Sequence, residues 1–361
     1  MTYHDTSIKP IAEPMKTKNR FNLFRLPQVA LVLSTATAVM AGTEEMKAPT
    51  SVVNTPDWLK VSGYAAASYT YTDVEDGDNG DTFFHTGTPL DAVKLGLEAI
   101  QGPISVYGSL FYSPNSDANS FAGGTEAGIL DAYVTYTAGA FKITGGKYLS
   151  YMGYEAFDTV NMSQLSYANS TTGGVPLYHT GVKVDYATEI WGAGLNVSDS
   201  IRGPSFWEGD SEYDNGLGYE AYVVYKGISK LTLWGGVAYD DTDNTPNFSS
   251  YDVWASYEIT DKLTVAGEVI YSDNTLSGAN SAWGGLAFLK YAFTDQFSLV
   301  GRFGIDEVES TGPTVTAPDN YKYTISPTYA FNEHFLVRGE VSYVDSANDV
   351  FFTGVQALLK F

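Results

Sequence analysis

Residues 350–361 alternate between two sets of side chains with a period of two, which is the geometry of a β-strand. Phe351, Val355 and Leu359 belong to a largely apolar set, whereas Gln356 and Lys360 belong to the other set. The segment is long enough to cross a bilayer as a tilted strand, which takes about 9–11 residues. An amphipathic edge strand of a soluble β protein is the alternative interpretation of this segment alone.

The same alternation recurs from Trp58 onward, and seven tight connections join pairs of alternating segments. They lie at residues 101–103, 137–140, 187–189, 226–230, 260–262, 294–296 and 332–333. Each resembles a β-hairpin turn. Seven hairpins with a first and a last strand predict sixteen strands. Residues 65–67 and 286–289 have similar side chains on both faces, which leaves fourteen and eighteen strands as alternatives.

Longer polar segments lie at the other ends of the strands, at residues 73–90, 113–127, 149–177, 199–215, 240–249, 273–281, 306–319 and 345–350. Short turns at one end and long loops at the other are typical of bacterial outer-membrane barrels. The pattern therefore predicts an all-β fold, a transmembrane antiparallel up-and-down β-barrel over residues 58–361. Loop 149–177 contains several apolar side chains, so we expect it to fold into the barrel mouth and narrow it, with an extended surface loop as the alternative.

The apolar face of each predicted strand carries its aromatic residues near the two ends, as with Tyr186 beside a tight turn and Tyr271 beside a long loop. Aliphatic residues and glycine lie between. Two aromatic bands around an aliphatic one suit two membrane–water interfaces. The apolar face is therefore expected against lipid, and the polar face in the lumen.

The N-terminal region predicts secretion. Residues 1–41 combine an extension with a signal peptide, in which a basic segment precedes the apolar run from Leu26 to Met40. An uncleaved membrane anchor is the alternative. Residues 42–57 are predicted as a linker. The expected location is the outer membrane of a Gram-negative bacterium after cleavage of the signal peptide.

The composition excludes several classes of function. The formal charge of −22 argues against a nucleic-acid partner, whose phosphates attract lysine and arginine. The chain has no cysteine, which excludes disulfides and thiolate metal sites. None of the common catalytic or phosphate-binding motifs is present, so neither an enzyme, a cofactor nor a metal is expected. His179 lies beside a threonine and is interpreted as a structural histidine.

The segment Gly145-Gly146-Lys147-Tyr148 is followed by Gly153-Tyr154-Glu155 and later by His179-Thr180-Gly181. This order of short motifs resembles the OmpL-like β-barrel porin family. The resemblance implies passive diffusion of small solutes. It marks Lys147, Glu155 and His179 as family-motif positions without giving them a role.

The sequence thus predicts a porin for small hydrophilic solutes and ions. A surface adhesin or scaffold barrel with a plugged lumen is the main alternative, and an outer-membrane hydrolase is a weaker one. Expected partners are outer-membrane lipid and lipopolysaccharide, the barrel-assembly machinery and the solutes themselves. A homo-oligomer is compatible with the sequence.

Charged residues on the predicted lumen face, at mid-height, form two arcs. One arc contains the bases Lys94, Arg302 and Arg338, with Glu340 expected to pair with one of the two arginines. The other arc contains the acids Asp131, Glu220, Asp252 and Glu268. Opposed charges across a narrow lumen create a field that acts on passing ions. Because acids outnumber bases, we expect a mild cation preference.

Leu359 and Phe361 resemble the C-terminal assembly signal of outer-membrane barrels, in which an aromatic last residue follows an apolar residue two positions earlier. Deletion of Phe361 should impair membrane insertion and leave secretion intact. The heat-modifiable fraction of the membrane protein measures insertion. Normal insertion of the truncated chain would show that the last strand is not an assembly signal.

Overall fold

The computed structural model describes residues 55–361, apart from 76, 78, 84–90, 114–126, 156–157, 169–174, 202–215, 242–246, 275–279 and 310–319. The predicted extension and signal peptide at 1–41, and the linker at 42–57 except for its last three residues, lie outside this range. Among the described residues, no helix has the length and apolar character needed to span a membrane.

Nearly all described elements are strands. They are β1 (Leu59–Val74), β2 (Gly80–Phe83), β3 (Val93–Gln101), β4 (Ile104–Tyr112), β5 (Ala127–Ala138), β6 (Phe141–Leu149), β7 (Tyr178–Ala187), β8 (Trp191–Ser198), β9 (Gly218–Ile228), β10 (Leu231–Asp240), β11 (Phe248–Thr260), β12 (Leu263–Asp273), β13 (Ser281–Ala292), β14 (Phe297–Glu309), β15 (Asn320–Ala330), β16 (Phe335–Asp345) and β17 (Val350–Lys360). A short 3-10 helix, η2 (Thr159–Asn161), lies between β6 and β7.

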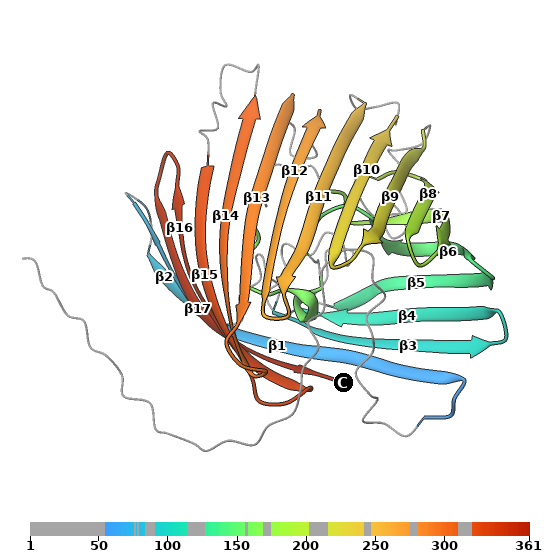
Figure 1. The fold of residues 1–361 in the computed structure, drawn as a ribbon, viewed down its shortest axis with the longest axis horizontal. Helices are drawn as coiled ribbons and strands as arrows, with labels where there is room; N and C mark the ends of the chain where they lie inside the picture. The colour runs from blue at the N-terminus through green and yellow to red at the C-terminus, as the bar shows by residue number, and fades with distance from the viewer. Residues whose placement is uncertain are drawn as a thin grey trace, which may run out of the picture. The chain divides into compact units, whose positions relative to one another are not determined.

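The strands form one closed antiparallel barrel (Figure 1). Consecutive strands pair from β3 to β17, and β1 closes the ring. One edge of β1 pairs with β3, from Leu59 opposite Ala99, and the other pairs with β17, from Tyr64 opposite Lys360. Sixteen strands make up the barrel, as the turn count predicted. Closure leaves the wall without an exposed sheet edge, which a membrane requires.

All seven predicted tight turns join neighbouring strands, and the long loops lie at the opposite ends. One difference appears in the segment 73–90, which was expected to be an irregular loop. Within it β2 pairs with the outer part of β1, from Tyr69 opposite Phe83 to Thr72 opposite Gly80. This extra strand satisfies backbone groups of β1 beyond the end of β3.

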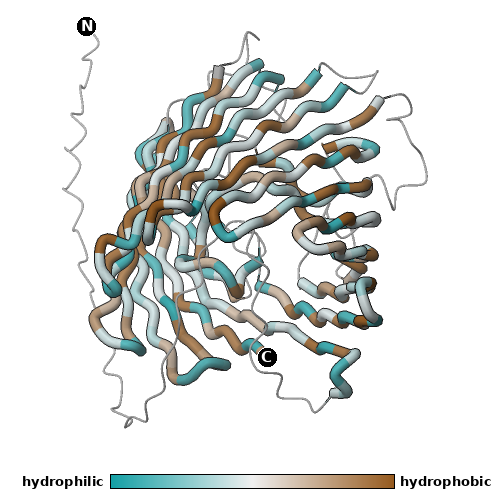
Figure 2. Tube along the Cα trace, turned by 45° about the vertical axis from the view of Figure 1, so that its right-hand side comes forward, coloured by the Kyte–Doolittle hydropathy of each residue, from teal (hydrophilic) through white to brown (hydrophobic). Residues whose placement is uncertain are grey.

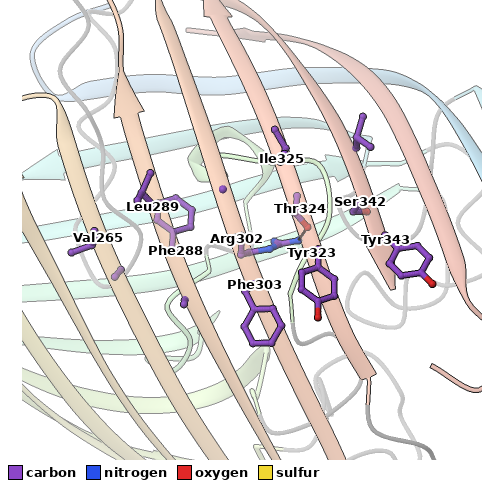
Figure 3. Close-up of a pocket in the computed structure, with 14 residues that line it drawn as sticks. Val265, Phe288, Leu289, Arg302, Phe303, Tyr323, Thr324, Ile325, Ser342 and Tyr343 are labelled. Carbon is purple, nitrogen blue, oxygen red and sulfur yellow. Dashed lines mark hydrogen bonds between the residues drawn. The ribbon is translucent and has the colours of Figure 1, made fainter. Parts of the chain in front are cut away.

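The two faces of the wall differ as predicted, and Figure 2 shows apolar and polar residues alternating along the strands. On β11, Val253 is 62% exposed on the outer face, whereas Asp252 is fully buried on the inner face. Figure 3 shows the same division on β14 and β15, where Arg302 and Thr324 lie side by side and the rings of Phe303 and Tyr323 point away from them. Exposed apolar residues on the outside suit a wall that faces lipid.

Aromatic pairs occur on the outer face near both rims. At the tight-turn end, the rings of Trp191 and Tyr225 are 4.4 Å apart. At the long-loop end, those of Tyr69 and Phe83 are 4.7 Å apart. These contacts agree with the two predicted aromatic bands, because amphipathic rings gather at membrane–water interfaces.

The inner face departs from the expected polar lining. Trp234, Trp254 and Phe288 point inward and are buried, together with Leu286 and Ile270. A water-filled lumen would leave such side chains exposed. They are buried because a long loop covers them inside the barrel.

An arginine placed on the lipid face tests the orientation of the wall. Val253→Arg should destabilise the barrel by about 2–4 kcal/mol, because a charge near the bilayer midplane is costly. Thr232→Arg, on the lumen face of the neighbouring strand, should cost much less. Reversible folding titrations into lipid vesicles measure both values, and equal losses would contradict the assignment of the faces.

Candidate functional site: the loop inside the barrel

Residues 150–177, which we call the lumen loop, connect β6 to β7, and the described residues of this loop pack against the inside of the barrel wall (Figure 1). Two glycines with positive φ lie near the point where the chain leaves the wall, Gly146 in β6 and Gly153 in the loop. Gly146 has a φ of 135° and Gly153 a φ of 97°, values that other residues rarely adopt. At Gly146 a Cβ atom would also lie within 3.0 Å of the backbone oxygen of Ala132. The backbone conformation at these two motif positions, Gly146 and Gly153, therefore favours glycine.

The first part of the lumen loop lies on a row of aromatic rings. Tyr222, Trp234 and Trp254 come from the neighbouring strands β9, β10 and β11, and their rings are nearly parallel, with interplanar angles of 12° and 7°. Tyr151 packs on Tyr222 at 4.5 Å between ring centroids, and Tyr154 packs on Trp254 at 5.4 Å. This row therefore acts as an apolar seat for the loop.

Glycines on the inner wall make room for two rings of that seat. A Cβ atom at Gly194 would lie within 3.0 Å of the Tyr222 ring, and one at Gly236 would lie equally close to the Trp234 ring. Each ring thus lies close to a glycine of the wall. A larger residue at either position would push the ring toward the lumen.

Two acids of the predicted acidic arc bind the backbone of the loop. Asp252 accepts a hydrogen bond from the Gly153 N–H at 2.9 Å, and Glu268 accepts one from the Tyr154 N–H. Hydrogen bonds from backbone amides stabilise a carboxylate without a basic partner. Burial in the seat raises the pKa of the neighbouring Tyr154 hydroxyl to about 12, so that hydroxyl stays neutral at pH 7.

Glu340 does not form the ion pair that the sequence suggested with Arg302 or Arg338. Its carboxylate instead accepts hydrogen bonds from the Leu165 N–H at 2.6 Å, the Ser166 N–H at 2.9 Å and the Ser166 hydroxyl. The prediction was wrong because it considered only wall residues. The loop brings donors to a carboxylate that is buried beneath it.

Arg302 contacts the loop on the same side of the lumen. Its guanidinium forms an ion pair with Glu155 and donates to the Ser166 carbonyl at 2.5 Å and to the Thr324 hydroxyl at 3.0 Å. Lys322 on the next strand donates to the Ser166 hydroxyl at 2.7 Å. These two cations, together with Glu340, fix residues 165–167 against β14–β16.

Lys94 joins the loop to a third part of the wall. Its ammonium lies 3.0 Å from Asp131 on β5 and 3.0 Å from Asp158 of the loop, and it is nearly fully buried. Ser109 donates to the Asp131 carboxylate at 2.6 Å. A buried cation with two acidic partners is well compensated, and Lys94 therefore contributes little free charge to the lumen.

Arg338 binds two carbonyl groups of the loop around η2. Its guanidinium donates to the Met162 carbonyl at 2.5 Å and to the Thr159 carbonyl at 2.8 Å. The eight charged residues that the sequence placed in the lumen are therefore all on the inner face. Seven of them contact or pair with the lumen loop directly, and Asp131 does so through Lys94.

The family model of the putative β-barrel porin-2, OmpL-like proteins matches residues 58–357. The chain belongs to this porin family. No relative was found among curated protein sequences.

Solved porin structures share the fold of this OmpL-like porin at low sequence identity. The anion-selective porin from Comamonas acidovorans has a TM-score of 0.63 and 10% identity, with 84% of this chain and 99% of that chain covered. OmpF of Salmonella typhi has a TM-score of 0.64 and 12% identity, with 84% and 97% covered. OprB of Pseudomonas putida has a TM-score of 0.65 and 11% identity, with 84% and 94% covered.

The three family-motif residues occupy separate positions in and around the lumen loop of this OmpL-like porin, with Lys147 and His179 buried and Glu155 partly buried. Lys147 donates to the Ile129 carbonyl at 3.3 Å. Glu155 accepts from the Ala168 N–H at 2.6 Å and pairs with Arg302, which bends the loop back on itself.

His179 is fully buried at the start of β7. One ring nitrogen lies 3.2 Å from Glu220 and 3.0 Å from the side-chain amide of Asn196. Ser150, the first residue of the lumen loop, also donates to Glu220. The histidine thus belongs to a polar cluster that holds the base of the loop, in agreement with a structural role. Within the described residues, no group of acids and histidines has the arrangement of a metal site.

The two residues of the predicted assembly signal lie at the barrel seam. The Phe361 N–H donates to the Gly63 carbonyl at 3.0 Å, and the Gly63 N–H donates to the Phe361 carbonyl at 2.9 Å. Leu359 lies opposite Ala65 of β1 and Phe335 of β16. The last strand therefore closes the barrel, and its role in assembly stays a prediction.

For several residues of the site, nothing in the sequence indicated that they hold the lumen loop in place. Lys322, Asp158 and Ser166 looked like ordinary lumen or loop residues, because their function depends on where the loop lies. The inward tryptophans did give a signal, since large aromatic side chains on a polar face of a strand need a covering partner.

Removal of the Glu340 carboxylate should release part of the lumen loop. Glu340→Leu leaves the amides of Leu165 and Ser166 without acceptors, and each buried orphan group costs about 1–3 kcal/mol. Chymotrypsin should then cut within residues 150–177 faster than in the wild-type protein. Glu258→Leu, at the tight-turn end of the lumen face, is the control. Wild-type cleavage rates in Glu340→Leu would show that these hydrogen bonds do not hold the loop.

Proposed function

We propose that this OmpL-like porin mediates passive diffusion of small hydrophilic solutes and ions past the lumen loop. The observation that carries the proposal is the attachment of one loop to widely separated parts of the inner wall. Its start binds β9–β12, and its later part binds β3 and β14–β16. Barrels of 16–18 strands are wide enough for an aqueous channel, so an internal loop supplies the size limit.

A mild cation preference is part of the proposal. Glu340 binds loop amides and not a base, and Asp252 and Glu268 are a neighbouring pair of carboxyl groups that also bind loop amides and have no basic partner. The bases Lys94 and Arg302 form ion pairs with loop acids. Arg338 and Lys322 bind neutral acceptors, and their positive charges oppose the negative charge of the acids. Ordered dipoles and uncompensated charges along a narrow path select ions.

The plugged-barrel alternative rests on the same loop, because a loop that filled the lumen would block diffusion. Single-channel conductance in planar bilayers separates a porin from a plugged adhesin or scaffold. The hydrolase alternative has less support, since Ser150 donates to Glu220 and not to His179. Assays on phospholipid substrates would test it.

The proposal places the protein in the outer membrane of a Gram-negative bacterium, after signal-peptide cleavage. Lipid and lipopolysaccharide would contact its outer face, and the barrel-assembly machinery would insert it. The exposed outer wall is also compatible with assembly of several copies.

Reversal potentials in a salt gradient test the cation preference. Asp252→Asn with Glu268→Gln keeps carbonyl oxygens that accept the loop amides and removes the negative charge of this carboxyl pair, so cation preference should fall. Arg302→Gln should increase it. Both shifts should shrink at 1 M salt, where screening acts over about 3 Å. An anion preference of the wild-type protein, or no response to these substitutions, would overturn the proposed selectivity.

A further inference from the structure

A buried carboxylate joins the first and last strands of the barrel. Asp91 precedes β3 and is fully buried. It accepts hydrogen bonds from the backbone N–H of Ser68 at 2.8 Å and from the Ser68 hydroxyl at 2.5 Å. The side-chain amide of Gln356 on β17 donates to the other carboxylate oxygen at 2.7 Å. Asp91 therefore contacts both strands of the closing seam.

The Gln356 amide also binds Arg338 on β16. Its oxygen accepts from Nε of Arg338 at 2.8 Å and from Nη2 at 2.5 Å. A carboxylate only accepts hydrogen bonds and a guanidinium only donates them. The two neighbours therefore allow a single orientation of the Gln356 amide, with its NH₂ group toward Asp91 and its oxygen toward Arg338.

Arg338 continues this series of hydrogen bonds into the lumen loop, where it binds the carbonyls of Thr159 and Met162. Ser68, Gln356 and Arg338 lie directly opposite one another across β1, β17 and β16. We call the series Ser68–Asp91–Gln356–Arg338 the seam relay. It can form only when β1 pairs with β17.

We propose that Gln356 is a positioning residue of the pore, which makes the docking of the lumen loop depend on closure of the β1–β17 seam. The inference rests on the proposed diffusion function for its effect on solutes, although the docking itself is independent of transport. Without Gln356, the Arg338 guanidinium loses the acceptor that directs it toward the loop carbonyls. The loop segment around η2 then leaves the wall more often, and the opening widens.

The chain has no cysteine, so a single introduced thiol reports on loop docking. Ser163 of the lumen loop, whose carbonyl accepts from Ser326 at 3.3 Å, is the site of the probe. In the Ser163→Cys background, Gln356→Leu should increase the rate of thiol modification about tenfold or more, because hydrogen bonds to charged groups contribute at least that factor. Single-channel conductance of Gln356→Leu should rise as well.

Gln356→Glu provides a signature that a loss of packing would not give. At neutral pH the introduced carboxylate faces Asp91 and cannot donate to it, so the loop should be released. In acid the protonated carboxyl donates again, and thiol modification and conductance should return toward wild-type values. Wild-type protein and Gln356→Leu, measured over the same pH range, should not show this recovery.

Ser342→Ala is the matched control, because Ser342 is a buried inner-wall residue of β16 whose hydroxyl has no hydrogen-bond partner among the described residues. It should behave like the wild-type protein. Wild-type modification rates in Gln356→Leu, or a Gln356→Glu variant that does not respond to pH, would overturn the proposal. If Gln356→Leu does not fold, the pH response of Gln356→Glu alone tests whether Gln356 positions the loop. A wild-type protein that does not conduct would contradict the diffusion function and leave the thiol test valid.

Discussion

The backbone of the lumen loop needs hydrogen-bond partners that it cannot supply itself. Apart from η2, the described part of the loop has no regular secondary structure, yet it is packed inside the barrel. Buried N–H and C=O groups without partners are costly. The wall supplies those partners as charged side chains, with acids such as Glu340 facing loop amides and bases such as Arg338 facing loop carbonyls. The charged residues of the wall are therefore also the residues that hold the loop in place.

This arrangement changes the role of charge in the lumen. Salt bridges such as Arg302–Glu155 and Lys94–Asp158 neutralise charge locally. An acid such as Glu340 instead holds the loop through amide donors and without a salt bridge. In the proposed channel, selectivity and pore size are therefore expected to be coupled, because a change at such an acid alters the field and the anchoring together. Substitutions that keep an acceptor oxygen separate the two effects, whereas truncations do not.

The sequence was sufficient to predict the barrel, because each strand has lipid on one side and the membrane requires every backbone group to be paired within the wall. Alternation, short turns and aromatic rims all follow from that one constraint. The same reasoning placed Asp252 and Arg302 on the lumen face. It could not find their partners, since the donors and acceptors come from a loop more than ninety residues away along the chain. Glu340 shows the resulting error most clearly.

The segment 286–289 was ambiguous in the sequence for a physical reason. Ala287 and Leu289 face outward, while Leu286 and Phe288 face inward and are buried, with the Phe288 ring 5.8 Å from that of Tyr154. Both faces of β13 are therefore apolar because each has an apolar neighbour, lipid outside and the lumen loop inside. A barrel strand loses its alternation where a protein surface replaces water in the lumen. Such a loss of alternation, on strands that must still span the membrane, indicates where an internal loop rests.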